Sequence, residues 1–168
     1  MVHSIGGLYV RLFAYTYPRD VVGMVLVDSS HEDQMAALEA GSLPAATTCE
    51  GNPGCEEFAA FAADQAEGDA ARQARGAHPL GHMPLVVPTA TETDGKSLAV
   101  WLRLQHELAG LSANSRQLVD PLSGHFIQED QPDFVIEALQ RVIYAVRYRS
   151  QLPAVRDLRC GDGSGSCR

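Results

Sequence analysis

Residues 21–27 read VVGMVLV, an almost unbroken apolar run that is rich in β-branched side chains and is followed by Asp28. A strand with one face in water alternates apolar and polar residues, so an unbroken run indicates a strand covered on both faces. Residues 84–90, PLVVPTA, form a second such run, in which Pro88 is expected to shorten the strand to about four residues. Strands of this kind belong to parallel sheets packed between helices, and the chain is therefore predicted to have an α/β fold.

Segments with helical periodicity alternate with these strands. Apolar residues recur at helical spacing over 5–17, 98–111 and 132–148, and 116–122 is a short strand candidate. This order predicts a parallel sheet with helices on both faces. Because the first element is a helix, the sheet would contain only three strands, and its first strand would have an unpaired edge.

Residues 31–80 differ in composition from the segments around them. They hold Ala-rich helical stretches on both sides of a loop of Pro, Gly and Cys residues, and Glu32 is expected at the start of the first helix, where negative charge is favourable. We interpret 31–80 as a helical cap inserted into a core formed by 1–30 and 81–150. The Gly/Ser-rich stretch 151–168 is interpreted as a flexible tail.

The charge of the chain argues against several classes of partner. Its 168 residues include 21 Asp and Glu but only 13 Lys and Arg, a formal net charge of −8. Nucleic acids and anionic membrane surfaces bind clusters of Lys and Arg, which the sequence lacks. It also lacks an apolar run of the ~20 residues that span a bilayer, and a signal peptide at its start. As encoded, the chain is expected in the cytoplasm.

The cysteines point to a different compartment. Cys49 and Cys55, like Cys160 and Cys167, form a short-range pair within a Gly-rich stretch that a disulfide could close. Zinc binding is less favoured, because structural zinc sites use closer Cys spacing, and unpaired thiols are a further alternative. Secretion would be consistent with these pairs if the natural N-terminus lies upstream of Met1.

A candidate nucleophile stands at the start of the first predicted helix. The segment His3-Ser4-Ile5-Gly6-Gly7 has the form G-x-S-x-G, except that Val2 occupies the first small position. A nucleophile on a strand-to-helix turn needs small neighbours because the turn is strained. Gly6 meets this need, and Val2 departs from it. A helix-capping Ser beside turn glycines is the structural alternative.

The surrounding segments carry a family resemblance. Ser4 to Tyr17-Pro18, and on to Val25-Leu26-Val27-Asp28, resembles the nucleophile elbow, the following helix and the next strand of the α/β-hydrolase family. The resemblance lapses over 31–80 and resumes at Pro84-Leu85-Val86-Val87. It is specific again at Ser123-Gly124-His125-Phe126-Ile127, which looks like the family's histidine loop. It implies an incomplete α/β-hydrolase fold, the C-terminal portion beginning at the nucleophile elbow.

The resemblance implies a serine hydrolase that cleaves an ester, an amide or a similar small substrate, with no cofactor or metal. Ser4 would be the nucleophile, and His125 the general base, because a loop after a strand can bring its imidazole to the serine. The backbone N–H of Ile5 would be one oxyanion donor. The second donor would come from a loop nearer the N-terminus of such a domain, outside this sequence.

The acid that orients His125 has three candidates. In most α/β-hydrolases the acid follows the strand that corresponds here to 84–90, which nominates Glu92 or Asp94. Some families place it one strand earlier, which nominates Asp28. We prefer Asp28, because it ends an apolar strand on the sheet edge that also carries Ser4, whereas Glu92 and Asp94 stand in a polar loop.

Other residues are given supporting roles. His3 is expected beside the nucleophile rather than as the base, and the remaining histidines show no partner pattern. Four apolar residues of the cap would line an acyl or alcohol pocket. These residues are Leu38, Leu43, Phe58 and Phe61.

Two alternative functions remain. The chain would be a truncated, inactive fragment or pseudoenzyme, acting at most as a binding module, if Val2, the absence of the strands expected before the elbow and the unpaired sheet edge prevent assembly of the site. Haloalkane or epoxide hydrolysis on the same fold is less favoured, because that chemistry usually requires Asp where Ser4 stands.

Overall fold

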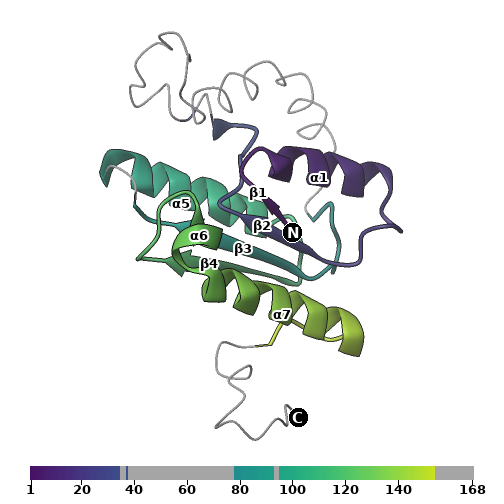
Figure 1. The fold of residues 1–168 in the computed structure, drawn as a ribbon. Helices are drawn as coiled ribbons and strands as arrows, with labels where there is room; N and C mark the ends of the chain where they lie inside the picture. The colour runs from purple at the N-terminus through teal and green to yellow at the C-terminus, as the bar shows by residue number, and fades with distance from the viewer. Residues whose placement is uncertain (35–36, 38–77, 93–94, 154–168) are drawn as a thin grey trace, which may run out of the picture.

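The computed structural model describes residues 1–34, 37, 78–92 and 95–153 and arranges them around a parallel sheet (Figure 1). The sheet has four strands in the order β1-β2-β3-β4, and each pairing between neighbours is parallel. The predicted α/β class is confirmed. The strands are β1 (Val2–His3), β2 (Met24–Val27), β3 (Leu85–Ala90) and β4 (Ser115–Asp120). The helices are α1 (Gly6–Thr16), α5 (Gly95–Ala109), α6 (Ile127–Asp130) and α7 (Pro132–Tyr148).

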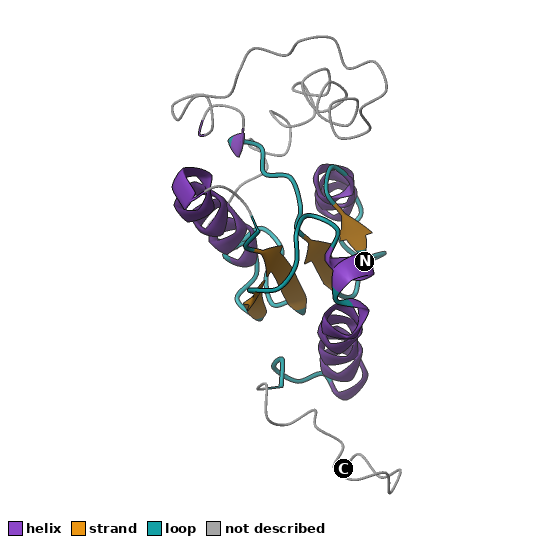
Figure 2. Ribbon diagram, turned by 60° about the vertical axis from the view of Figure 1, so that its left-hand side comes forward, coloured by secondary structure: helices purple, strands orange, loops and turns teal. Residues whose placement is uncertain are grey.

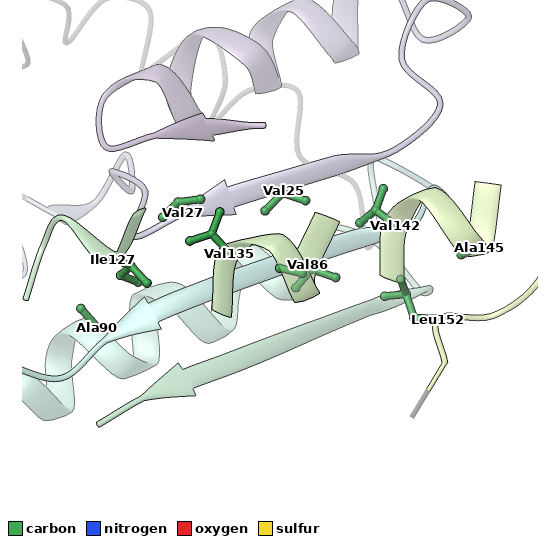
Figure 3. Packing of buried hydrophobic residues seen from close by; sticks show 10 residues of the cluster. Val25, Val27, Val86, Ala90, Ile127, Val135, Val142, Ala145 and Leu152 are labelled. Carbon is green, nitrogen blue, oxygen red and sulfur yellow. The ribbon is translucent and has the colours of Figure 1, made fainter. Parts of the chain in front are cut away.

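Helices cover both faces of the sheet (Figure 2). Successive side chains of β2 point to opposite faces, as the period of a strand requires. Val25 and Val27 pack against α6 and α7, where Figure 3 shows Val135 and Ile127 facing the strands. Met24 and Leu26 belong to a second cluster, with apolar residues of α1 and α5. The unbroken apolar run of β2 is therefore explained by burial on both sides.

The prediction of a three-stranded sheet that begins with a helix was wrong. Residues Val2–His3 form a short parallel strand, with Val2 opposite Leu26 and His3 opposite Val27. This strand covers the edge of β2 that was expected to be unpaired. Two residues are too few to show any hydrophobic period, so the sequence pattern could not reveal the strand.

The effect expected of Pro88 was also wrong. β3 continues through Pro88 to Ala90, and Pro88 pairs with Leu118 of β4. Its carbonyl oxygen accepts a hydrogen bond of 2.8 Å from the backbone N–H of Asp28. Proline lacks only the donor, so its acceptor still serves the sheet. This bond helps to hold Asp28 at the carboxyl end of β2.

Most of the predicted cap lies outside the described residues. The same is true of Asp94, the four cysteines, the cap residues expected to line a pocket, and the tail from 154 onward. Among the helices that the structure describes, none combines the length and apolar character of a membrane span.

Candidate active site

Ser4 lies in a tight turn between β1 and α1. Its φ of 51° is in the left-handed region, which is costly for a residue with a Cβ. Three hydrogen bonds hold the turn: the N–H of Ser4 donates to the Val27 carbonyl at 3.1 Å, and its carbonyl accepts from the N–H groups of Gly7 and Ser30 at 3.0 Å. The surrounding backbone therefore fixes the strained conformation of this serine.

The glycines after Ser4 are explained by close packing. A Cβ on Gly6 would lie 3.3 Å from the Cβ of Val2, so the two positions around Ser4 that favour small residues face each other. The missing side chain of Gly6 leaves room for Val2. A Cβ on Gly7 would lie only 2.6 Å from the Cβ and Oγ of Ser29. Gly7, to which the motif gave no special role, is thus the more constrained glycine.

We expect Gly7→Ala to lower the free energy of unfolding by about 1 to 3 kcal/mol, because the new methyl group would overlap Ser29 and force the turn to shift. Gly6→Ala is the matched comparison and should cost less, since Val2 has only a short distance to move. Urea denaturation of both variants measures the difference. A Gly7→Ala protein as stable as the unmodified chain would contradict this account of the turn.

His125 lies on the loop between β4 and α6, and its imidazole bridges two residues that are distant in sequence. Its Nδ1 lies 2.8 Å from Oδ2 of Asp28, and its Nε2 lies 3.0 Å from Oγ of Ser4. A carboxylate can only accept, so Nδ1 carries the proton of the neutral ring and Nε2 presents its lone pair to the serine hydroxyl. The arrangement suits proton transfer from Ser4 to His125.

Asp28 follows β2 and is almost fully buried. Its φ of 40° is again left-handed. Its Oδ2 contacts His125, while Oδ1 accepts hydrogen bonds from the N–H of Ala90 at 3.0 Å and from Nε1 of Trp101 at 2.9 Å. Each carboxylate oxygen therefore has at least one donor, which balances the burial of its charge.

Of the three acid candidates, the structure places Asp28 at His125. Glu92 is exposed, with its carboxylate beside Gly124, and its backbone N–H donates to the Ser123 carbonyl. Asp94 falls outside the described residues. The order of the strands explains the difference. Ser4 directly follows β1 and Asp28 directly follows β2, and because these strands are parallel neighbours, the two residues lie side by side at the carboxyl ends of the strands.

The loop that carries His125 has its own supports. Asp120 accepts from the hydroxyl of Ser123 at 2.6 Å, and Asp130 accepts from the N–H of Gly124 at 3.0 Å. Nε2 of His3 lies 2.8 Å from the carbonyl oxygen of His125, and the two rings lie 4.5 Å apart. His3 thus lies beside the site, as expected from its place in the motif, and contacts the backbone of the loop.

A buried ion pair lies behind the Ser4 turn. Nη1 of Arg11 contacts Oε2 of Glu32 at 2.7 Å, and both side chains are fully buried. Arg11 also donates to the carbonyls of Gly7 and Ser30, at 2.9 and 3.1 Å. Glu32 was predicted to begin the cap helix, and it lies just before a helical turn at Gln34; its buried pairing with Arg11 was not predicted. The pair ties α1 to the segment after β2.

The electrostatics of Glu32 reflect this environment. Burial by itself raises the pKa of Glu32, but the charge of Arg11, the electrostatic effect of His31 and hydrogen bonds from Arg11 and from the backbone lower it from 4.5 to about 2. Glu32 is therefore ionised at neutral pH despite its burial.

His31, Asp33 and Glu107 form a cluster of the residue types that bind metals, with one ligand atom of each within 4.8 Å of the others. Nδ1 of His31 accepts a hydrogen bond of 3.0 Å from the backbone N–H of Asp33. The proton of the neutral ring is then on Nε2, which lies 3.4 Å from Oε2 of Glu107. Both ring nitrogens are engaged within the protein, which suits a structural hydrogen-bond network better than metal ligation.

Ile5, the predicted oxyanion donor, directly follows Ser4 and occupies the N-cap position of α1. The first N–H groups of a helix point outward along its axis, toward the place where negative charge is favoured.

Comparisons with known proteins do not identify a family for this chain. A scan against protein-family models, a search of curated proteins and a search of solved structures return no match. The functional argument therefore depends on the geometry of Ser4, His125 and Asp28.

Proposed function

We propose that this chain is a serine hydrolase of the α/β-hydrolase type that cleaves an ester, an amide or a similar small substrate. The observation that carries the proposal is the hydrogen-bonded series Ser4–His125–Asp28, with distances of 3.0 and 2.8 Å between residues separated by 121 and 97 positions. Three distant segments supply a hydroxyl, an imidazole and a carboxylate in the order that acyl transfer requires.

The proposed reaction follows from this geometry. Nε2 of His125 accepts the proton of Ser4 as Oγ attacks the carbonyl carbon of the substrate, and Asp28 stabilises the imidazolium that forms. The N–H of Ile5 donates to the oxygen that becomes negative. His125 then gives the proton to the leaving group. Water, activated by the same imidazole, releases the acyl group from Ser4.

The alternative of an inactive fragment or pseudoenzyme, at most a binding module, rested in part on Val2 and on an unpaired sheet edge. Val2 fits opposite Gly6, and β1 pairs with β2. These observations answer two of the grounds for that alternative, and we favour the enzyme because Ser4, His125 and Asp28 form one hydrogen-bonded series. A Ser at the nucleophile position likewise disfavours haloalkane or epoxide hydrolysis.

The proposal is tested by treating the full chain with a fluorophosphonate, which reacts with activated serines, and locating the adduct by peptide mass spectrometry. We expect one adduct, on Ser4, whose formation depends on the folded state. The same chain unfolded in urea is the control, and a circular-dichroism melt establishes folding. A cooperatively folded chain without an adduct, or with adducts spread over several serines, would refute the proposal.

A further inference from the structure

We propose that Trp101 is a positioning residue of this site: its indole N–H holds the Asp28 carboxylate so that Oδ2 faces His125. The inference rests on the proposed function and adds a residue that no sequence motif indicated. Nε1 of Trp101, on α5, donates to Oδ1 of Asp28 at 2.9 Å.

Two elements anchor the same carboxylate oxygen. The backbone N–H of Ala90 at the end of β3 also donates to Oδ1, at 3.0 Å. Rotation of a carboxylate about its last side-chain bond is only weakly restricted by the side chain itself. One donor would leave the group free to pivot, whereas donors from β3 and α5 together fix it. Oδ2 is thereby reserved for Nδ1 of His125.

The helix that carries the indole is held independently of this bond. Gln105, one turn after Trp101, donates through Nε2 to the carbonyl of Ser29 at 2.6 Å. Leu104 and Leu108 are fully buried in the core. Removing the indole N–H should therefore leave α5 in place and change only the anchoring of Asp28.

The pH at which His125 takes up a proton depends on how firmly the Asp28 carboxylate is held. Among the described residues, the titratable groups facing or flanking its loop are Asp28, the ring of His3, Asp120 at Ser123, and the carboxylates of Glu92 and Asp130 beside Gly124. Changing the indole alters none of the other groups. A change in the pH at which His125 takes up a proton would therefore reflect a change in its contact with Asp28.

The chain contains a single Trp, so a Trp analogue enters at position 101 alone. We would replace it biosynthetically with β-(3-benzothienyl)alanine, in which sulfur stands in place of the indole N–H, and prepare Trp101→Phe as a genetic counterpart. Arg103→Gln, an exposed change on the same helix, is the control. NMR titration of the His125 imidazole, assigned with a His125→Gln protein, gives the midpoint without requiring catalysis.

We expect the midpoint of the His125 titration to fall by about half a pH unit or more in both the analogue-substituted protein and Trp101→Phe. The reason is that a less firmly held Asp28 carboxylate stabilises the imidazolium less. The maximal rate of phosphonate labelling should fall ~10-fold at an unchanged half-saturating concentration, since orientation is lost but binding is not. Arg103→Gln should change neither quantity.

An unchanged or raised midpoint in either folded Trp101 protein would overturn the inference. If neither folds, the indole N–H of the unmodified chain gives one ¹⁵N cross-peak that should move in Asp28→Asn, and a stationary peak would overturn it. Absence of labelling at Ser4 in the unmodified chain would instead refute the proposed function, while the titration would still decide the role of Trp101.

Discussion

Ser4→Ala and His125→Gln should each reduce turnover of a chromogenic ester by about 10⁵- to 10⁶-fold, the largest effects expected of any single change. In the proposed mechanism Ser4 supplies the atom that forms the acyl bond, and Nε2 of His125, 3.0 Å from its Oγ, accepts its proton. Ser4→Ala should also abolish phosphonate labelling. Retention of the wild-type circular-dichroism melt separates loss of chemistry from loss of fold.

Asp28→Asn belongs to the same series and should lower turnover by about 10⁴-fold, because the amide stabilises the wrong tautomer of His125. Glu92→Gln is the matched control and should remain within about twofold of the unmodified chain, since the Glu92 carboxylate is exposed. A Glu92→Gln protein as impaired as Asp28→Asn would contradict the assignment of the acid.

The second large effect concerns stability. Arg11→Met should lower the free energy of unfolding by about 3 to 5 kcal/mol, because it leaves the Glu32 carboxylate buried without its cation. Arg103→Met is the control: Arg103 pairs with Glu107 at the surface, and its loss should cost less than about 1 kcal/mol. Urea denaturation at neutral pH measures both values.

The double variant Arg11→Met/Glu32→Gln should recover part of this loss, because it removes the uncompensated charge. If the double variant is no more stable than Arg11→Met alone, the loss comes from packing around Arg11 and from its hydrogen bonds to the Gly7 and Ser30 carbonyls rather than from an uncompensated charge.

The same pair predicts the pH dependence of folding. The folded state lowers the pKa of Glu32 from 4.5 to about 2, so its stabilisation is complete above the unfolded value. This stabilisation by ionised Glu32 amounts to about 3 kcal/mol, and it is lost as the pH falls from about 5 to about 2. In Arg11→Met this part of the acid transition should be absent, and an unaltered acid transition would contradict the assignment.

Much of the fold follows from local patterns. The helix over 132–148 was predicted with the bounds that α7 has, and the two apolar runs contain β2 and β3. These patterns are informative because burial on one helix face, or on both faces of a strand, imposes a period on the sequence. The short strand β1 and the four-residue helix α6 have too few residues to show one.

The contacts behind the site were not predictable in this way. Arg11 and Glu32 are charged, and charged residues are expected at the surface unless a partner is known. Trp101 stands at a helical offset among apolar residues, so its position resembled that of an ordinary core residue. In both cases the polar partner comes from another segment of the chain.

The sequence alone determined the order of the longer elements α1, β2, β3, α5, β4 and α7, and with it the positions of Ser4, Asp28 and His125 near the ends of elements, because apolar spacing records burial. Only the tertiary structure decided that Asp28 rather than Glu92 meets His125, and that Trp101 holds Asp28. Those contacts join residues 97 and 73 positions apart. They depend on how β2, α5 and the histidine loop pack together, which no local pattern of residues encodes.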